Sequence, residues 1–203
     1  MPSVIPPITA IVLAAGKGHR FGGDKMLQPI PVINSNNPEH TLPMGLRSAL
    51  NVRPHVDQVI CVVRPDDKAL IQVLHEHAFK TVINHEFELG LSSSIKAGVR
   101  SAHSDHHIMI CLGDMPFITE ASYQSIIQAF YSQPSSICRG CFVSGSDTPL
   151  MGHPVIFPHV FRPQLLALQG DKGAQSIMQS LPINTIKIED KGIIKDIDHK
   201  SDL

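Results

Sequence analysis

This sequence has no excess of charge of either sign, no long apolar run and few cysteines. Lys and Arg number 17 against 18 Asp and Glu, so no charge excess favours binding to nucleic acid or to an anionic membrane. No apolar run approaches the roughly 18 residues that cross a bilayer, and residues 1–7 lack the basic start of a secretory signal. Four cysteines in 203 residues do not make a disulfide scaffold and suit a reducing compartment. We therefore expect a cytoplasmic protein with no nucleic-acid or membrane partner.

What is present is an ordinary globular composition, with 42% apolar and 17% charged residues. In the first two thirds of the chain, short apolar runs typical of buried parallel strands alternate with helical patterns. The expected strands are 8–15, 57–64, 81–84 and 108–113, and the expected helices are 44–52, 66–79, 92–102 and 119–131. This alternation predicts an α/β fold with a mostly parallel sheet.

After residue 134 the strand–helix alternation becomes less regular. We expect a strand over 137–144, a short strand over 155–157, and helices near 159–168 and 174–181. A final hairpin of strands 185–189 and 193–197 would turn at Lys191 and Gly192. Residues 29–43 form a polar, proline-rich stretch, which we expect to be a loop.

A glycine-rich segment, LAAGKGHRFGGDK over residues 13–25, follows the first expected strand directly. Glycines lack a Cβ, so consecutive backbone N–H groups in such a turn can point inward and form an anion-binding nest. Lys17, Arg20 and Lys25 add three cations that bind phosphate oxygens well. The spacing fits neither GxxxxGK[ST] nor GxGxxG. The segment predicts a polyphosphate site; the alternative is a flexible turn with incidental basic residues.

A carboxylate ends the most apolar of the expected strands, where residues 111–116 read CLGDMP. Ligands of open α/β sheets bind beyond the carboxyl ends of the strands, so Asp114 should face the same crevice as the glycine-rich loop. Mg²⁺ prefers one or two carboxylates together with phosphate oxygens and water. Asp114 is therefore a candidate Mg²⁺ ligand. The alternative is a carboxylate that caps the next helix or holds a turn.

Small hydroxyl side chains gather at the start of the helix expected from residue 92. The segment reads GLSSSIKAG over residues 90–98, and Ser92 is a candidate N-cap. Exposed hydroxyls of Ser92, Ser93 and Ser94 could hydrogen-bond a base or a ribose. Helix capping alone explains them equally well.

These motifs together resemble those of the nucleotidyltransferases that activate sugars, alditols and the molybdenum cofactor. The first segment is similar to the family's LAAGxGxRxG…K signature, and the strand end to its LGDMP motif. The resemblance implies that Arg20 and Lys25 stabilise charge at the reacting phosphate and that Asp114 coordinates the catalytic metal. The serine segment is similar to G-[LM]-S-S-S-[IL] of the cofactor cytidylyltransferase branch. The implied nucleotide-binding residues are Leu13, Ala14, Ala15, Gly16, Gly18, Arg20, Lys25, Ser92, Ser93 and Ser94.

The resemblance also implies a three-layer fold of the nucleotide-diphospho-sugar transferase type, with a Rossmann-like nucleotide-binding half. Residues 1–203 would form a single domain, in which about 8–134 bind the nucleotide and about 135–203 bind the acceptor. A second metal ligand of the family lies in a D-I-D-T-P-x-D-L pattern, similar here to DIDHKSDL over 196–203. Alternation along a strand puts Asp196 and Asp198 on one face, and Asp198, nearer the end, is the expected ligand. His199 and Lys200 replace Thr-Pro, so Asp196 stays open as the alternative.

Two later segments resemble the family's borders of the second-substrate pocket. GHPVIF over 152–157 is similar to GHPVxF, and GDKGA over 170–174 to GDxGA. The resemblance implies acceptor-binding roles for His153, Pro154, Asp171 and Lys172. His153 could donate to a phosphate or pterin, or be a packed structural histidine. Lys172 could face the acceptor's phosphate, or be a solvated loop lysine.

These expectations describe a Mg²⁺-dependent nucleotidyltransferase. The resemblance implies CTP and a molybdopterin-type cofactor as substrates, because an opening LAAG rather than LAGG favours cytidine over guanosine in that family. The products would be the cytosine dinucleotide cofactor and pyrophosphate, and an apo-molybdenum hydroxylase the partner. The alternatives are a guanylyltransferase on the same acceptor, a sugar- or alditol-phosphate nucleotidyltransferase, and a non-catalytic cofactor carrier or nucleotide sensor.

Two other clusters suggest metal binding, and we expect neither to be a metal site. His103, His106 and His107 lie where a polar connector between helix and strand is expected. Cys138 and Cys141 form one CxxC in an expected strand, whereas a structural zinc site needs four ligands.

Overall fold

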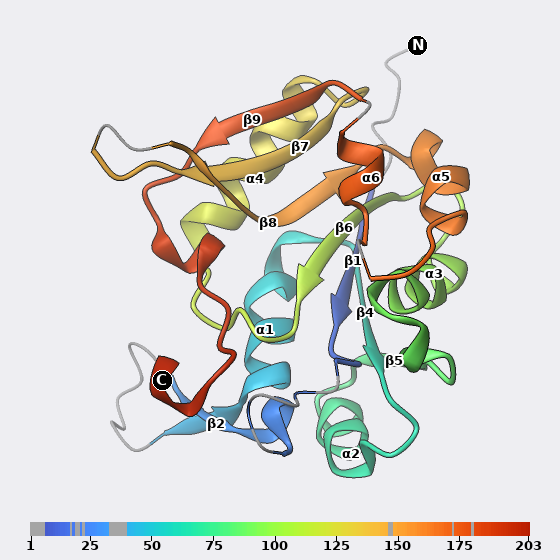
Figure 1. Ribbon diagram of the computed structural model, residues 1–203, viewed down its shortest axis with the longest axis vertical. Helices are drawn as coiled ribbons and strands as arrows, with labels where there is room; N and C mark the ends of the chain where they lie inside the picture. Colours follow the sequence, from blue (N-terminus) through green and yellow to red (C-terminus); the bar gives the residue numbers. More distant parts are fainter. Residues whose placement is uncertain are drawn as a thin grey trace.

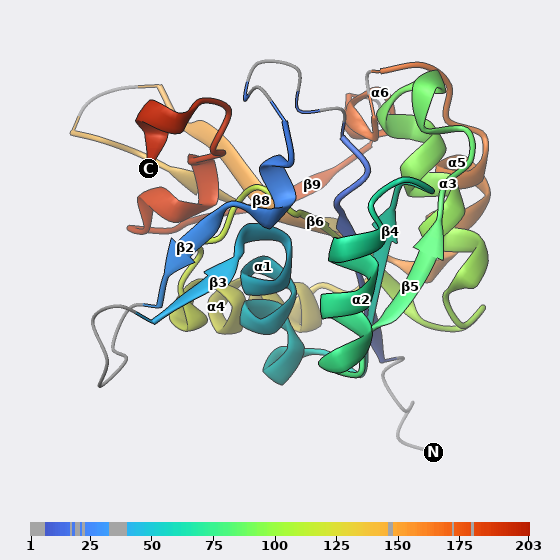
Figure 2. The same cartoon turned by 90° about the horizontal axis from the view of Figure 1, so that it is seen from below.

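The computed structural model describes residues 7–16, 18, 21, 23–32, 40–145, 148–171, 173–179 and 181–203. At its centre is a seven-stranded sheet in the order β5-β4-β1-β6-β8-β7-β9, with helices packed on both faces (Figures 1 and 2). The strands of this sheet are β1 Ile8–Leu13, β4 Gln58–Val63, β5 Lys80–Ile83, β6 His107–Leu112, β7 Ile137–Phe142, β8 Leu150–Phe157 and β9 Ile183–Lys187. β8 runs antiparallel to β6 and β7, and the other neighbouring pairs run parallel. The predicted mostly parallel α/β sheet is confirmed.

Alternating residues of the central strands pack into two hydrophobic cores, one on each face of the sheet. On β1, Ala10 and Val12 belong to one core, and Ile11 and Leu13 to the other. Helices α1 Met44–Val52, α2 Lys68–Glu76 and α4 Glu120–Ser132 cover the first face. Helices α3 Leu91–Ser101, α5 Arg162–Leu166 and α6 Gln175–Met178 cover the second. Because both faces of β1 are buried, its run is continuously apolar, as the sequence suggested.

Helix boundaries in the first two thirds follow the sequence pattern closely. Helix α1 spans the expected residues, and α4 begins after Thr119, whose side chain accepts a hydrogen bond from the backbone N–H of Ser122. Helices α5 and α6 are shorter than the expected 159–168 and 174–181, and a 3-10 turn, His159–Phe161, precedes α5. None of the helices in the described ranges is long and apolar enough to cross a membrane.

Two expectations about strands are wrong. The stretch 29–43 is not wholly loop, because β2 Pro29–Pro31 pairs antiparallel with β3 Thr41–Pro43; residues 33–39 between them lie outside the described residues. The hairpin 185–189 and 193–197 does not form. Strand β9 pairs parallel with β7 instead, and Lys191–Ile194 is a 3-10 turn. The side chain of Asp190 accepts from the backbone N–H of Gly192 at 2.7 Å, which holds this turn and prevents a second strand.

The four cysteines are free thiols buried in the core, with Cys138 and Cys141 on β7. The rings of His103 and His106 lie 4.9 Å apart between α3 and β6. Among the described residues, no cluster of three or more His, Cys, Asp and Glu side chains is arranged to hold a metal ion.

Candidate active site

The carboxyl ends of β1 and β6 place the glycine-rich loop beside Asp114. The two strands pair up to Leu13 and Leu112, and the backbone N–H of Gly113 donates to the carbonyl of Leu13 at 2.9 Å. A Cβ on Gly113 would lie 3.0 Å from that carbonyl oxygen, so glycine permits the close approach. The Ser48 hydroxyl of α1 fixes the same turn by donating to the Gly113 carbonyl at 2.9 Å. The loop and the acid therefore leave the sheet side by side, as the sequence predicted.

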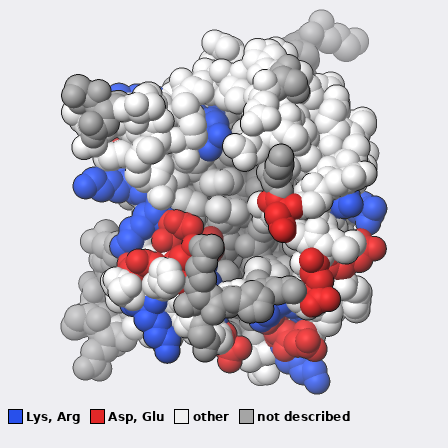
Figure 3. All heavy atoms as spheres, viewed as in Figure 1, with Lys and Arg blue, Asp and Glu red and all other residues white. Residues whose placement is uncertain are grey.

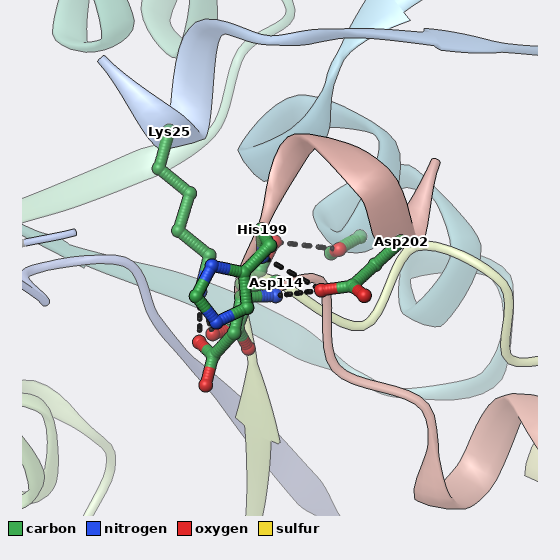
Figure 4. A network of polar contacts seen from close by, with 7 residues as sticks. Lys25, Asp114, His199 and Asp202 are labelled. Atoms are coloured by element: carbon green, nitrogen blue, oxygen red, sulfur yellow. Dashed lines mark hydrogen bonds and ion pairs between the residues drawn. The ribbon is translucent and has the colours of Figure 1, made fainter. Parts of the chain in front are cut away.

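Lys25 joins two carboxylates at the end of this loop. It begins the 3-10 turn Lys25–Leu27 and is only 8% exposed. Its ammonium donates to Oδ2 of Asp114 and Oδ1 of Asp198, each at 2.8 Å (Figure 4). Burial alone would lower the pKa of Lys25, but the two hydrogen bonds and the two negative charges raise it above its ordinary value. Lys25 is therefore a fixed cation between two acids.

The C-terminal segment brings Asp198 to this position (red in Figures 1 and 2). The backbone N–H of Ile197 donates to the carbonyl of Asp114 at 3.0 Å, and the Ile197 side chain is fully buried in a small core with Met44. Asp202 then turns the chain, since its Oδ2 accepts from the backbone N–H groups of Asp198 and His199 at 3.0 and 2.6 Å (Figure 4). Asp196 is exposed to solvent. The expected strand is absent, but Asp198 is the acid that meets Lys25.

A cavity of about 330 Å³ opens beside these acids. In Figure 3 it is part of the hollow at the middle of the face shown, with acidic side chains on the rim. The loop after β1, the end of β6, the start of α3 and the segment at 171 all contribute to its walls. The lining residues are Leu13, Ala15, Gly16, Gly18, Lys25, Met26, Phe87, Glu88, Gly90, Leu91, Ser94, Leu112, Asp114 and Asp171.

Two motifs far apart in the sequence meet on the far wall of the cavity. The backbone N–H of Ser92 donates to the carbonyl of Gly170 at 3.2 Å. Gly90 has φ +90°, and a Cβ there would lie 1.9 Å from Oδ1 of Asp171. Only glycine suits both that backbone conformation and that contact. The start of α3 and the Gly170–Asp171 turn therefore form one wall.

The serines at the start of α3 are buried, which corrects the expectation of exposed hydroxyls. Ser92, Ser93 and Ser94 are 1%, 3% and 5% exposed. Asn84 donates to the hydroxyls of Ser93 and Ser94 at 2.9 and 3.0 Å, and Ser93 donates to the carbonyl of Gly90 at 2.7 Å. The N-cap is Gly90 and not Ser92, whose hydroxyl has no partner among the described residues. The hydroxyls of Ser93 and Ser94 thus hold the segment between β5 and α3, and Ser94 alone of the three serines lines the cavity.

The MobA-like NTP transferase domain matches residues 10–185 of this sequence. The chain belongs to this family. Among curated relatives, nicotine blue oxidoreductase of Paenarthrobacter nicotinovorans is 26% identical, covering 96% of this chain and 93% of the relative. A protein of Thermococcus gammatolerans named probable molybdenum cofactor guanylyltransferase is 27% identical over 68% of this chain and 65% of its own length.

Solved structures share the fold of this MobA-like NTP transferase. Rv0371c of Mycobacterium tuberculosis superposes with a TM-score of 0.77 at 23% identity, covering 98% of this chain and 96% of that one. The same mycobacterial protein solved in complex with manganese superposes with a TM-score of 0.68 at 20% identity, covering 91% and 89% of the two chains. These likenesses establish the three-layer arrangement.

Of the predicted nucleotide-binding residues of the MobA-like NTP transferase, six line the cavity: Leu13, Ala15, Gly16, Gly18, Lys25 and Ser94. Ala14 instead packs into the hydrophobic core on the face covered by α1, α2 and α4. Ser92 and Ser93 lie behind the wall, as described above. Arg20 and the neighbouring Lys17 fall outside the described residues.

The predicted acceptor-binding residues separate into different places. Asp171 lines the cavity beside Asp114, whereas His153 lines a second cavity of about 410 Å³. Pro154 is buried in β8 and lines neither of these two cavities, and Lys172 is outside the described residues. Leu91 and Leu112 line both cavities, which are therefore neighbours.

Sequence reasoning missed several lining residues. Phe87 and Glu88 border the first cavity from the turn before α3, where no motif marks them. Arg139 borders the second from β7. The available signal was a single cation inside the apolar run ICRGCF, a pattern that is unusual for a buried strand.

Proposed function

We propose that this chain is a Mg²⁺-dependent nucleotidyltransferase of the cytoplasm, which transfers cytidylate from CTP to the phosphate of a molybdopterin-type cofactor and releases pyrophosphate. The observation that carries the proposal is the Lys25 ammonium held between Asp114 and Asp198 at the edge of a cavity formed partly by Gly16 and Gly18. Cation, paired acids and glycine-rich backbone are the groups that a triphosphate with its metal ion requires.

Asp114 and Asp198 fit a Mg²⁺ ion by their chemistry. Both offer hard carboxylate oxygens, and both oxygens lie 2.8 Å from the same nitrogen, so they lie near one another. Two carboxylates leave the other positions of the ion to phosphate oxygens and water, which is the usual arrangement for Mg²⁺. The manganese complex of the mycobacterial relative supports a divalent cation in this fold. When bound, the ion would neutralise charge on the phosphates and polarise the α-phosphate.

The reaction needs no covalent intermediate on the protein. A phosphate oxygen of the acceptor attacks the α-phosphorus of CTP, a new phosphorus–oxygen bond forms, and the bond to the β-phosphate oxygen breaks. The electron pair leaves with pyrophosphate. The backbone N–H groups of the loop and the Lys25 ammonium would offset this charge, with Arg20 assigned the same role by resemblance. Positioning and electrostatics supply the rate enhancement.

The choice of base comes from two segments of the sequence. Cytidine rests on the opening LAAG at residues 13–16 and on the segment GLSSS at 90–94. The name of the archaeal relative favours the guanylyl alternative. Ser92 and Ser93 are buried away from the cavity, so Ser94 alone of the three serines is placed to contact a base. An apo-molybdenum hydroxylase that receives the product remains the proposed partner.

Pyrophosphate release tests the proposal. Purified protein is incubated anaerobically with CTP, GTP, ATP or UTP, with or without molybdopterin, in Mg²⁺ and in EDTA. We expect release with CTP that requires both molybdopterin and Mg²⁺, and none from Asp114→Asn. Release with GTP alone would replace cytidine by guanosine. Release only with a sugar or alditol phosphate, or binding of CTP and molybdopterin with no release at all, would contradict the proposal.

A further inference from the structure

The second cavity lies between α3 and the sheet, beside the first. Leu91 and Ile95 border it on the helix side, and Ile110, Val155 and Phe157 on the sheet side. We call it the Arg139 pocket; its remaining lining residues are Leu112, Arg139, Met151, His153, Gly173, Ala174, Gln175 and Met178. Its volume of about 410 Å³ falls in the range of small-molecule sites, which are mostly apolar with a few polar groups.

Arg139 brings an unpaired positive charge to this apolar wall. Its guanidinium donates to the carbonyl of Gly152 at 3.0 Å and to the sulfur of Met178 at 3.8 Å. Its Nε is buried with no hydrogen-bond partner, and no described carboxylate forms an ion pair with it. Burial lowers the pKa of Arg139, although it stays a cation. A half-buried cation with unused donors favours an oxygen-bearing ligand.

His153 is a second polar residue of the pocket with an atom that makes no hydrogen bond. Its Nδ1 is buried and has no hydrogen-bond partner among the described residues. Burial in the first place, and then the charge of Arg139, lower the pKa of His153 to about 4. The ring is therefore neutral near pH 7 and adds no charge to the pocket. Among the described residues that line the Arg139 pocket, Arg139 is the one with a charged side chain.

We propose that the Arg139 pocket binds the ring end of the acceptor, and that Arg139 selects a flat heterocycle carrying a carbonyl or anionic oxygen. The inference rests on the proposed function, because the ring must enter here while the acceptor's phosphate reaches Asp114 next door. A pocket between a helix and a sheet, lined mostly by apolar side chains, suits a flat ring. It does not suit a sugar or alditol, whose many hydroxyls would lose their hydrogen bonds to water.

The first experiment measures molybdopterin and CTP binding separately, without turnover. Molybdopterin is titrated anaerobically by its pterin absorbance, and CTP by calorimetry. We expect Arg139→Met to weaken molybdopterin binding at least about tenfold, as expected for loss of a charged hydrogen bond. Arg139→Lys should fall between Arg139→Met and the native protein, and the CTP affinity should change less than about twofold in both. Native molybdopterin affinity in Arg139→Met would overturn the assignment.

A second pair of variants tests the pocket without removing a buried contact. Met151 is 51% exposed and lines the pocket, so Met151→Trp should fill its mouth and weaken molybdopterin binding. Leu150 is 55% exposed on the same strand and does not line the pocket, so Leu150→Trp is the matched control. Equal molybdopterin affinities in the two variants would overturn the proposal, even if Arg139→Met did not fold.

Other outcomes separate this inference from the proposed function. Ribitol 5-phosphate and glucose 1-phosphate should not displace molybdopterin, and displacement by either at similar affinity would contradict a ring-selective pocket. Molybdopterin binding that depends on Arg139, without pyrophosphate release from any nucleotide, would support the pocket and end the proposed reaction. CTP binding by a protein that does not bind molybdopterin would end the pocket proposal and leave the nucleotide site.

Discussion

The backbone N–H of Ile197 donates a hydrogen bond to the carbonyl oxygen of Asp114, with 3.0 Å between nitrogen and oxygen. This bond ties the C-terminal segment to the turn that follows β6. As a result, the next side chain along the chain, Asp198, reaches the ammonium of Lys25. A hydrogen bond between two distant segments of the backbone thus brings Asp114 and Asp198 together.

The paired acids predict that Asp198 and Asp196 differ sharply in importance. Asp198→Asn keeps the side-chain shape but removes half of the negative charge of the pair. We expect the rate of pyrophosphate release to fall about 10²- to 10³-fold, the scale of a key electrostatic group. Asp196→Asn is the matched control, since Asp196 is exposed, and its rate should stay near that of the native protein. Similar losses in both variants would argue against Asp198 as the second metal ligand.

Lys25→Met should change metal affinity and catalysis in opposite directions. The Lys25 ammonium neutralises the two carboxylates, so it competes with a divalent cation for the same oxygens. Without nucleotide, Mn²⁺ binding followed by electron paramagnetic resonance should tighten in the variant. Pyrophosphate release should nevertheless drop by about 10²-fold or more, because a cation at the phosphates is lost. Weaker Mn²⁺ binding in Lys25→Met would show that the lysine does not compete for the site.

Gly90→Ala should destabilise the fold, while Gly16→Ala should not. At Gly90, φ is +90° and a Cβ would collide with Asp171, so we expect a loss of about 1–3 kcal/mol in the free energy of unfolding. At Gly16 a Cβ would meet nothing within 4 Å. Urea unfolding of both variants provides the comparison. Because Gly16 lines the cavity, its variant is expected to lose CTP affinity instead of stability.

The buried imidazole of His107 predicts a loss of stability in mild acid. Burial, followed by the charges of His159 and His106, lowers its pKa from 6.5 to about 4. Between these values the unfolded chain binds a proton that the folded protein excludes, so stability is full above pH 6.5 and falls toward pH 4. This group contributes a slope of up to about 1.4 kcal/mol per pH unit. His153, whose pKa is also lowered, adds to the same trend.

The pH dependence of stability is measured by urea unfolding between pH 7.5 and pH 5, above the range where most carboxylates titrate. His107→Leu should flatten the dependence on pH, whatever its absolute stability. The exposed His85 serves as a control, and His85→Gln should keep the native slope. An unchanged slope in His107→Leu would assign the acid sensitivity to other groups.

Where the sequence predicted the structure well, the signal was local. Strand β1 and helix α1 carry their burial pattern within a few consecutive residues, so apolar runs and helical spacing suffice to place them. The meeting of the glycine-rich loop with Asp114 was also predictable. Parallel strands end at one edge of a sheet, so the two segments that follow β1 and β6 had to leave it together.

The tertiary structure alone decided the rest, because partners distant in sequence determine it. Ile193 lies in a 3-10 turn and not in a strand. The reasons are that the side chain of Asp190 accepts a hydrogen bond from the backbone N–H of Gly192, and that β9 pairs with β7. Ser93 and Ser94 turned inward because Asn84, which directly follows β5, donates hydrogen bonds to their hydroxyls. Burial of a polar side chain and the charge around it depend on which groups pack against it in space. Local sequence determined which chemistry this chain carries, and folding determined which of those groups share a pocket.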